Sequence, residues 1–193
     1  ITYTQWLNER GYMEADLTVM KISPREFMVV ATDTMHNHVL DHMRRRISKD
    51  DHVTVTDVTA RYAQINLQGP KSRALLQELT SVDLNNFPFR RTHEIDMGFA
   101  NVLCSRITYV GELGYELFIP TEQALHVYDL IVTEGQKYGL KHAGVRALGS
   151  LRLVSRVFSC HSEVEASHFS WSHVLFLRYS GEGRHLSFSS SVS

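Results

Sequence analysis

The sequence predicts an α+β fold, with mixed or antiparallel sheets and helices that flank them. Short runs rich in β-branched and aromatic residues occur between residues 17 and 119, and segments with helical spacing of apolar residues lie among them and after them. The two kinds of segment do not alternate one to one, as they would in a parallel α/β sheet. The predicted fold class follows from that irregular order.

The first third of the chain predicts a β-hairpin followed by a helix. Strands at residues 17–22 and 26–31 flank the turn sequence Ser-Pro-Arg. Asp33 is a candidate N-cap for a helix over residues 34–47, in which apolar residues recur at helical spacing. Arg44–Arg46 has aspartates on both sides, which indicates a solvated helix end and not a nucleic-acid contact.

The middle of the chain predicts strands at residues 53–58 and 61–68, and then another helix. Pro70 stands at the predicted first position of this helix, where its missing N–H costs nothing. The apolar side of the helix consists of Leu75, Leu76 and Leu79. A polar, proline-containing loop over residues 83–91 is expected to follow.

Two more strands are expected near residues 101–109 and 115–119. Thr121 is a candidate N-cap for a long amphipathic helix that Gly139 ends. A last helical segment covers residues 142–153.

The composition changes after residue 153. Residues 154–193 contain twelve serines and four histidines, and they lack eight residue types that the preceding chain uses. Apart from the brief run HVLFLRY, this segment has no strand-type or helix-type period. We therefore expect residues 1–153 to form a partial domain and residues 154–193 to be a disordered tail that is foreign to the fold. Our hypothesis is that the tail is intron-derived or frame-shifted, since Val154–Ser155 is the dipeptide expected from reading into an intron.

The overall composition is typical of a soluble globular protein. The formal net charge of −1 gives no reason to expect a nucleic-acid or membrane-surface partner. No apolar run approaches the ~18 residues needed to cross a bilayer. Cys104 and Cys160 form no CxxC pair, which fits a reducing compartment. The chain begins with Ile1 and shows no signal or transit peptide, so we expect it to be part of a longer protein.

The run YVGELGYEL, residues 109–117, places two glycines and two glutamates in an otherwise apolar stretch. The glycines permit a sharp turn or the close approach of a ligand. In a strand here, Tyr115 and Leu117 would face one side, and Glu116 and Phe118 the other. A glutamate beside an aromatic ring can bind the edge of a planar heterocycle. Spacing alone nevertheless favours a hairpin with solvated glutamates.

Two other groups of residues have functional alternatives. Glu14 and Asp16 are two apart at the entry to a strand, so we expect them to share a face. One of them could act as a general base or stabilise a cation, although composition favours exposed turn acids. His38 and His42 share a helix face near His36, but no HExxH pattern and no neighbouring cysteine accompanies them. We interpret these three as surface histidines and predict no metal site.

Four fragments in order resemble the aminomethyltransferase-like folate-binding domain. They are WLNERGYMEADLTV, INLQGPKSRALLQELT, ITYVGELGYELFIP and HAGVRALGSLRL, and together they extend over roughly Ile1 to Leu153. This domain occurs in the T-protein of the glycine cleavage system. It also forms the C-terminal half of sarcosine and dimethylglycine dehydrogenases. The fold that the resemblance implies is the N-terminal part of that domain.

The resemblance also implies roles for five residues. Asp16 matches the catalytic aspartate beside the reacting folate nitrogens, and Glu116 matches the residue that holds the pterin edge. Tyr109 matches an aromatic residue of the folate pocket, and Arg146 matches an arginine that assists the same clamp. Asn8 lies in the turn that leads into the site. Glu112, in the turn, is expected to have a structural role.

Some positions depart from the T-protein pattern. The T-protein usually has paired acids where this chain has Ala15–Asp16, and an asparagine where it has Ala31 or Thr32. These departures look more like the dehydrogenase branch. The segment ALHVYDLIVTEGQKYGLKHAG looks like that branch and equally resembles the regulatory subunit of pyruvate dehydrogenase phosphatase.

The resemblance implies a mitochondrial matrix protein in which a separate FAD domain oxidises an N-methyl group. The folate domain then captures the one-carbon unit on tetrahydrofolate as the 5,10-methylene form. If the tail is foreign to the fold, we expect the chain to lack both the FAD domain and the rest of the folate domain, and therefore to show weak or absent folate binding and no dehydrogenase activity on its own. The alternatives are a non-catalytic regulator like the phosphatase subunit and a fragment of a glycine cleavage aminomethyltransferase.

Overall fold

The computed structural model describes residues 1–155 and 173–179. These residues divide into two compact units. The first unit contains residues 1–59 together with strand β9 (His173–Tyr179), and the second contains the described residues from 60 onward up to residue 155. Each unit has its own sheet and its own apolar core.

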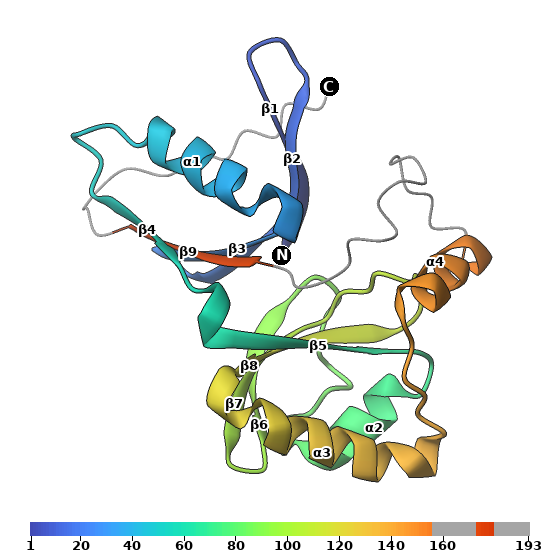
Figure 1. The fold of residues 1–193 in the computed structure, drawn as a ribbon. Helices are drawn as coiled ribbons and strands as arrows, with labels where there is room; N and C mark the ends of the chain where they lie inside the picture. The colour runs from blue at the N-terminus through green and yellow to red at the C-terminus, as the bar shows by residue number, and fades with distance from the viewer. Residues whose placement is uncertain (156–172, 180–193) are drawn as a thin grey trace. The chain divides into compact units, whose positions relative to one another are not determined.

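The first unit is built on a five-stranded antiparallel sheet with the order β1-β2-β3-β9-β4 (Figure 1). Its other strands are β1 (Thr2–Leu7), β2 (Met13–Ser23), β3 (Glu26–Ala31) and β4 (Val53–Asp57). Along β2, Ala15, Leu17 and Val19 are buried, and the residues between them are half-buried. This alternation is what a strand with one covered face requires.

Helix α1 (His36–Arg46) covers the face of this sheet that carries the buried side chains (Figure 1). Val39 and Met43 lie four residues apart on the helix and pack into the same cluster as Leu17 and Val29. The i, i+4 spacing therefore places one helix stripe over the sheet. His38 and His42 lie beside that stripe, because they immediately precede Val39 and Met43 in the helix.

The second unit is built on a four-stranded antiparallel sheet with the order β5-β8-β7-β6. Its strands are β5 (Tyr62–Gln68), β6 (Thr92–Met97), β7 (Ala100–Ser105) and β8 (Gly114–Pro120). Helices α2 (Ser72–Leu79) and α3 (Ala124–Gly135) cover one face of this sheet (Figure 1). Helix α4 (Val145–Val154) follows at the end of the unit.

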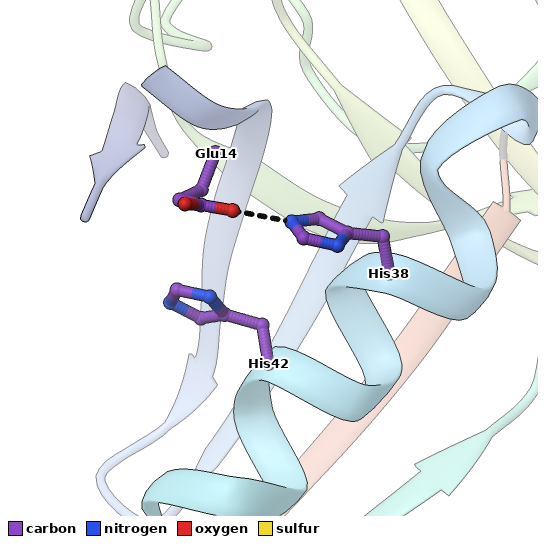
Figure 2. A group of neighbouring side chains, drawn as sticks. All are labelled: Glu14, His38 and His42. Atoms are coloured by element: carbon purple, nitrogen blue, oxygen red, sulfur yellow. Dashed lines mark hydrogen bonds and ion pairs between the residues drawn. The ribbon is translucent and has the colours of Figure 1, made fainter. Parts of the chain in front are cut away.

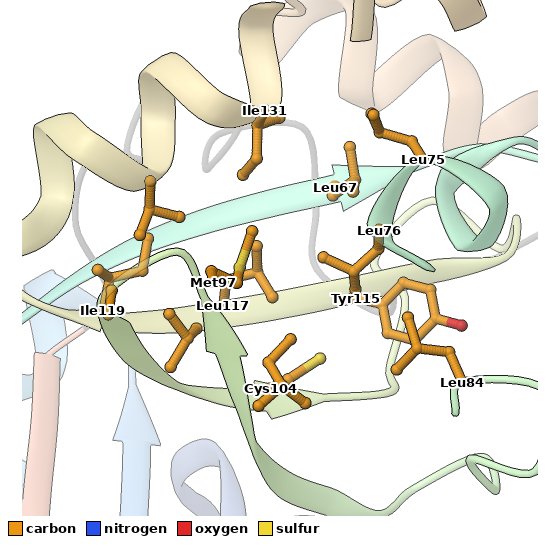
Figure 3. Packing of buried hydrophobic residues seen from close by; sticks show 14 of the residues in the cluster. Leu67, Leu75, Leu76, Leu84, Met97, Cys104, Tyr115, Leu117, Ile119 and Ile131 are labelled. Carbon is orange, nitrogen blue, oxygen red and sulfur yellow. The ribbon is translucent and has the colours of Figure 1, made fainter. Parts of the chain in front are cut away.

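The core of the second unit lies between this sheet and the two helices that cover it (Figure 3). Tyr115, Leu117 and Ile119 of β8 point into the core, as do Leu75 and Leu76 of α2. The free thiol of Cys104 is also buried there, and burial raises its pKa to about 12. This thiol therefore stays protonated and behaves as an apolar core group.

The predicted fold class is confirmed, since the two sheets are antiparallel and carry flanking helices. Three strands were not predicted from the sequence, β1, β6 and β9. β1 and β6 are edge strands, and their sequences TYTQWL and THEIDM mix polar and apolar residues without a buried run. The predicted strand over residues 101–109 is too long, because β7 ends at Ser105 and residues 106–113 form a loop.

The predicted helix starts are less accurate than the helices themselves. Helix α1 begins at His36 after a short 3₁₀ turn (Asp33–Met35), and α2 begins two residues after Pro70. Thr121 starts a 3₁₀ turn before α3, and its hydroxyl group donates a hydrogen bond to the carbonyl oxygen of Ala60 instead of capping the helix. Gly139 ends the α3 region in the left-handed conformation, with φ of 73°, as predicted.

The predicted tail is described only in part. Helix α4 continues to Val154, and residues 156–172 and 180–193 lie outside the described residues. The run HVLFLRY, the one segment of the tail with a strand-like pattern, forms β9 and pairs with both β3 and β4. A foreign origin for residues 154–193 stays a prediction.

No helix in the described parts of the chain has the length and apolar character that a membrane span needs.

Leu76→Ala tests how much the core of the second unit contributes to stability. Leu76 is fully buried, so the change should lower the free energy of unfolding by about 2–5 kcal/mol through lost burial and an unfilled cavity. Leu125→Ala is the matched control, because Leu125 lies on α3 with 72% of its surface exposed. We expect the control to change stability by less than about 0.5 kcal/mol in urea denaturation. Equal losses in both variants would contradict the assigned core.

Candidate functional site

Asn8 organises the turn that joins β1 to β2. Its side-chain oxygen accepts hydrogen bonds from the backbone N–H groups of Arg10 (2.9 Å) and Tyr12 (3.0 Å). Gly11 makes the turn possible, since its φ is 80°. The side-chain nitrogen of Asn8 then donates a hydrogen bond of 2.9 Å to Oε1 of Glu14. Asn8 therefore holds Glu14 in place, and its predicted role toward a folate stays a prediction.

Glu14 is the extra residue of a β-bulge. Trp6 pairs with Ala15 and Leu7 pairs with Met13, so no residue of β1 stands opposite Glu14. Bulges of this kind redirect a side chain. As a result, Glu14 reaches helix α1, where its Oε2 lies 2.7 Å from Nε2 of His38.

Asp16 has a different partner from Glu14. The hydroxyl group of Tyr3 on β1 donates a hydrogen bond of 2.5 Å to Oδ2 of Asp16. Asp16 pairs across the strands with Gln5, whereas the neighbouring Ala15 pairs with Trp6 on the side that faces α1. The expectation that Glu14 and Asp16 share a face is therefore wrong, because the bulge changes the alternation between them.

His42 completes a cluster with Glu14 and His38 (Figure 2). Only 7% of His42 is exposed, and its ring stacks on Trp6 with 5.2 Å between ring centroids. The prediction of surface histidines is thus wrong for His42. Burial and the nearby Arg46 lower the pKa of His42, and hydrogen bonds from Asn8 and His38 lower the pKa of Glu14.

The glycines of the YVGELGYEL stretch have different uses, the turn that the sequence indicated and a close contact with the side chain of Gln68. Gly111 lies in the loop with φ of 82°, a conformation that other residues rarely adopt. Gly114 opens β8, and a Cβ atom there would lie 2.0 Å from Oε1 of Gln68. Glu112 is exposed in the loop between these glycines. The stretch is thus a loop that leads into a closely packed strand.

Glu116 lies on the face of β8 opposite the core. Its neighbours Tyr115 and Leu117 are fully buried on the other side, as the strand alternation predicted. Oε2 of Glu116 accepts a hydrogen bond of 3.1 Å from the side-chain amide of Gln64. Burial raises the pKa of Glu116 to about 7, and the bond from Gln64 lowers it only in part. Among the five predicted site residues, Glu116 is the one that combines a ligand-binding group with a strongly shifted pKa near neutrality.

Strand β5 places a row of side-chain amides on this same face of the sheet. Gln64, Asn66 and Gln68 alternate with core residues, and Asn66 pairs directly with Glu116. Gln68 accepts a hydrogen bond of 2.8 Å from the hydroxyl group of Thr108. Its buried amide nitrogen has no hydrogen-bond partner among the described residues. The sheet therefore presents donors and acceptors that its own side chains do not fully use.

Tyr109 contacts an arginine that the sequence did not identify. The guanidinium of Arg152 lies 4.0 Å from the centre of the Tyr109 ring, and it donates a hydrogen bond to the carbonyl oxygen of Tyr109. Arg146, the arginine expected here, is exposed near the start of α4. The two arginines are six residues apart on one helix, and no sequence signal distinguishes them without the loop conformation of residues 106–113.

The described residues are compatible with a folate in two respects. A pterin ring offers amino and N–H donors along one edge. Glu116 provides a half-buried carboxyl group whose Oε1 has no hydrogen bond among the described residues, so it could accept from such donors. A buried polar atom on the same sheet face also lacks a partner within the described part of the chain, namely Nε2 of Gln68. Such atoms cost stability unless something satisfies them. A polar ligand is one way to do so.

Glu116→Gln should make the protein more stable at neutral pH. The pKa of Glu116 is about 7 in the folded chain and near its ordinary value of 4.5 in the unfolded chain, so ionisation favours unfolding as pH rises. The penalty is absent below pH 4.5 and builds up until pH reaches about 7. Above that pH we expect the variant to be more stable by roughly 2–3 kcal/mol in urea denaturation.

Glu112→Gln is the matched control for this pH series, because Glu112 is exposed in the same stretch. Its stability should follow that of the wild type at every pH. A difference between Glu116→Gln and the wild type that does not vary with pH would show that Glu116 is ionised normally.

Arg152→Ala tests the contact with Tyr109. The change removes both the stacked guanidinium and its hydrogen bond, and we expect a loss of about 1–2 kcal/mol in the free energy of unfolding. Arg146→Ala on the same helix should cost less than about 0.5 kcal/mol because Arg146 is exposed. If thermal unfolding finds the two variants equally affected, the contact does not stabilise the loop.

Known proteins share this sequence pattern. The regulatory subunit of pyruvate dehydrogenase phosphatase from Mus musculus, a mitochondrial protein, is 35% identical over 79% of this chain and 18% of its own length. Human mitochondrial dimethylglycine dehydrogenase is 33% identical over 76% of this chain and 17% of its own length. A probable aminomethyltransferase from Thermococcus kodakarensis is 31% identical over 79% of this chain and 43% of its own length. The chain thus spans less than half of each of these relatives.

Residues 1–172 match the family described as the GCVT N-terminal domain. The match includes both α1 and β8, and therefore both clusters of side chains described above. It agrees with the four fragments that resemble the T-protein and with the antiparallel sheets and flanking helices. The chain belongs to the GCVT N-terminal domain family.

Proposed function

We propose that this chain is the tetrahydrofolate-binding portion of a protein like sarcosine or dimethylglycine dehydrogenase. The observation that carries the proposal is Glu116, a half-buried carboxyl group beside Gln64 on a polar sheet face, with its pKa raised to about 7. Family membership and the 33% identity with human dimethylglycine dehydrogenase support the same assignment. In the full-length protein, a separate domain would bind FAD and oxidise the N-methyl group.

Glu116 is proposed to accept hydrogen bonds from the edge of the pterin ring. An ionised carboxylate accepts such bonds better than a protonated one, so binding should favour loss of the Glu116 proton. Because burial keeps the pKa near 7, a large share of the protein carries that proton at neutral pH. Folate binding and proton release are therefore expected to be coupled.

Asp16 is proposed to stabilise the cationic one-carbon species that reacts with the folate nitrogen. Its Oδ2 is held by Tyr3, and its Oδ1 is buried and lacks a partner within residues 1–155 and 173–179. A fixed carboxylate of this kind stabilises a developing positive charge without having to reorganise. Holding the one-carbon unit near its acceptor also limits its loss to water.

A non-catalytic regulator is the second candidate. The observation that favours it is the 35% identity with the pyruvate dehydrogenase phosphatase regulatory subunit. A fragment of an aminomethyltransferase is a third candidate, supported by 31% identity with the Thermococcus protein. The mitochondrial relatives support a mitochondrial location, and the matrix is our proposal.

Titration of the 193-residue chain with tetrahydrofolate tests the proposal. We expect weak, saturable quenching of the protein's tyrosine and tryptophan fluorescence, since the chain spans less than a fifth of the dehydrogenase. Glu116→Gln should weaken binding at least about tenfold, the cost of losing one charge-assisted hydrogen bond. The wild-type affinity should also rise between about pH 6 and 8 as Glu116 loses its proton.

Glu112→Gln is the control, since it alters a glutamate of the same stretch that is exposed in the loop. Its affinity for tetrahydrofolate should equal that of the wild type. Equal weakening by both substitutions, or no saturable binding in the wild type, would contradict folate recognition by Glu116. The regulator would then become the favoured candidate.

A further inference from the structure

We propose that Glu14, His38 and His42 form a binding site for a divalent transition metal ion of the zinc class. Each residue offers one ligand atom, and these atoms all lie within 4.8 Å of one another (Figure 2). The site lies in the first unit, between the bulge of β2 and one face of α1. It does not depend on the proposed folate function.

The donor set suits this class of metal ion. Two imidazole nitrogens and one carboxylate oxygen are common ligands of Zn²⁺ and of neighbouring first-row ions. In a tetrahedral site with metal–ligand distances of ~2.0–2.1 Å, ligand atoms lie roughly 3.3 Å apart. Nε2 of His38 and Oε2 of Glu14 are now 2.7 Å apart and share a hydrogen bond. For a metal ion to replace the shared proton, this pair would have to open by roughly 0.6 Å. The widest ligand-atom separation in the cluster, which is at most 4.8 Å, would have to close by up to about 1.5 Å.

The surrounding residues already hold the ligands in place. His38 and His42 are four residues apart on α1, so they project from the same helix face. Trp6 stacks on His42 with an angle of 19° between the rings. Asn8 binds Oε1 of Glu14, which leaves Oε2 directed toward His38. Outer contacts of this kind fix ligand orientation at metal sites.

An open depression of about 610 Å³ adjoins the cluster, and Glu14 and His42 line it together with three arginines, Arg10, Arg45 and Arg46. The arginines disfavour a cation by repulsion, although Arg45 is paired with Asp41 at 2.9 Å. Their charge also favours an anion or a hydroxide as an additional ligand. Three protein ligands beside an accessible space are the pattern of catalytic metal sites rather than of closed structural ones.

The simpler explanation is an ordinary Glu14–His38 hydrogen bond with His42 as a core residue. That explanation accounts for the pair and for the bulge that forms it, but it gives no role to the ring nitrogen of His42, which lies within 4.8 Å of both partners. The two explanations make different predictions about metal binding. Only a metal site requires all three side chains together.

Titration of the metal-free 193-residue chain with Co²⁺ tests the proposal. We expect visible absorption bands that saturate at one ion per chain and that Zn²⁺ displaces. Glu14→Gln and His38→Ala should each weaken Co²⁺ binding at least about tenfold, because each removes a ligand. His36→Ala should leave binding within about twofold of the wild type, since His36 lies on the same helix and pairs instead with Asp57 at 2.8 Å.

Thermal unfolding provides a second measurement and a check on folding. Zn²⁺ should raise the unfolding temperature of the wild type and of His36→Ala, because a ligand that binds only the folded chain stabilises it. It should not raise that of His38→Ala, which removes a half-exposed side chain and should fold. Absence of saturable Co²⁺ binding in the millimolar range would overturn the proposal. Equal weakening in His36→Ala and His38→Ala would overturn it as well.

Discussion

Strand β8 is the element on which the second unit depends most. It pairs with β5 on one side and with β7 on the other, and its inward side chains Tyr115, Leu117 and Ile119 meet the helices that cover the sheet. Because successive side chains of a strand point to opposite faces, Glu116 must then lie on the face away from the core. The same constraint that builds the core therefore takes a carboxyl group partly out of water, and the raised pKa of Glu116 is its consequence.

A glutamate in this position is costly for stability, and the fold offsets the cost only in part through Gln64. Groups of this kind are concentrated at functional sites, because a pKa near neutrality makes protonation easy to couple with binding. The neighbouring side-chain amides have the same property, since Gln68 also keeps a buried donor without a partner among the described residues. The polar face of the sheet is thus suited to a ligand that supplies both donors and acceptors.

The sequence predicted those parts of the fold that are encoded locally. The alternation around Glu116, the end of the α3 region at Gly139 and the apolar side of α2 all follow from neighbouring residues. The contacts of Glu14 and Arg152 could not be predicted in the same way. His38 lies 24 residues from Glu14, and a β-bulge directs the side chain of Glu14 toward it. Arg152 contacts Tyr109 in a loop whose conformation depends on the rest of the unit.

In the first unit, strand β4 has no partner other than β9 within the described residues. Without that strand, β3 and β4 would each present an unpaired edge, which favours aggregation. The pairing joins backbone groups, and backbone hydrogen bonds place few demands on side-chain identity. A β-prone run such as His173–Tyr179 could therefore complete the sheet even if the segment around it did not evolve with this domain. Pairing in the sheet and a foreign origin of the tail are thus compatible on physical grounds.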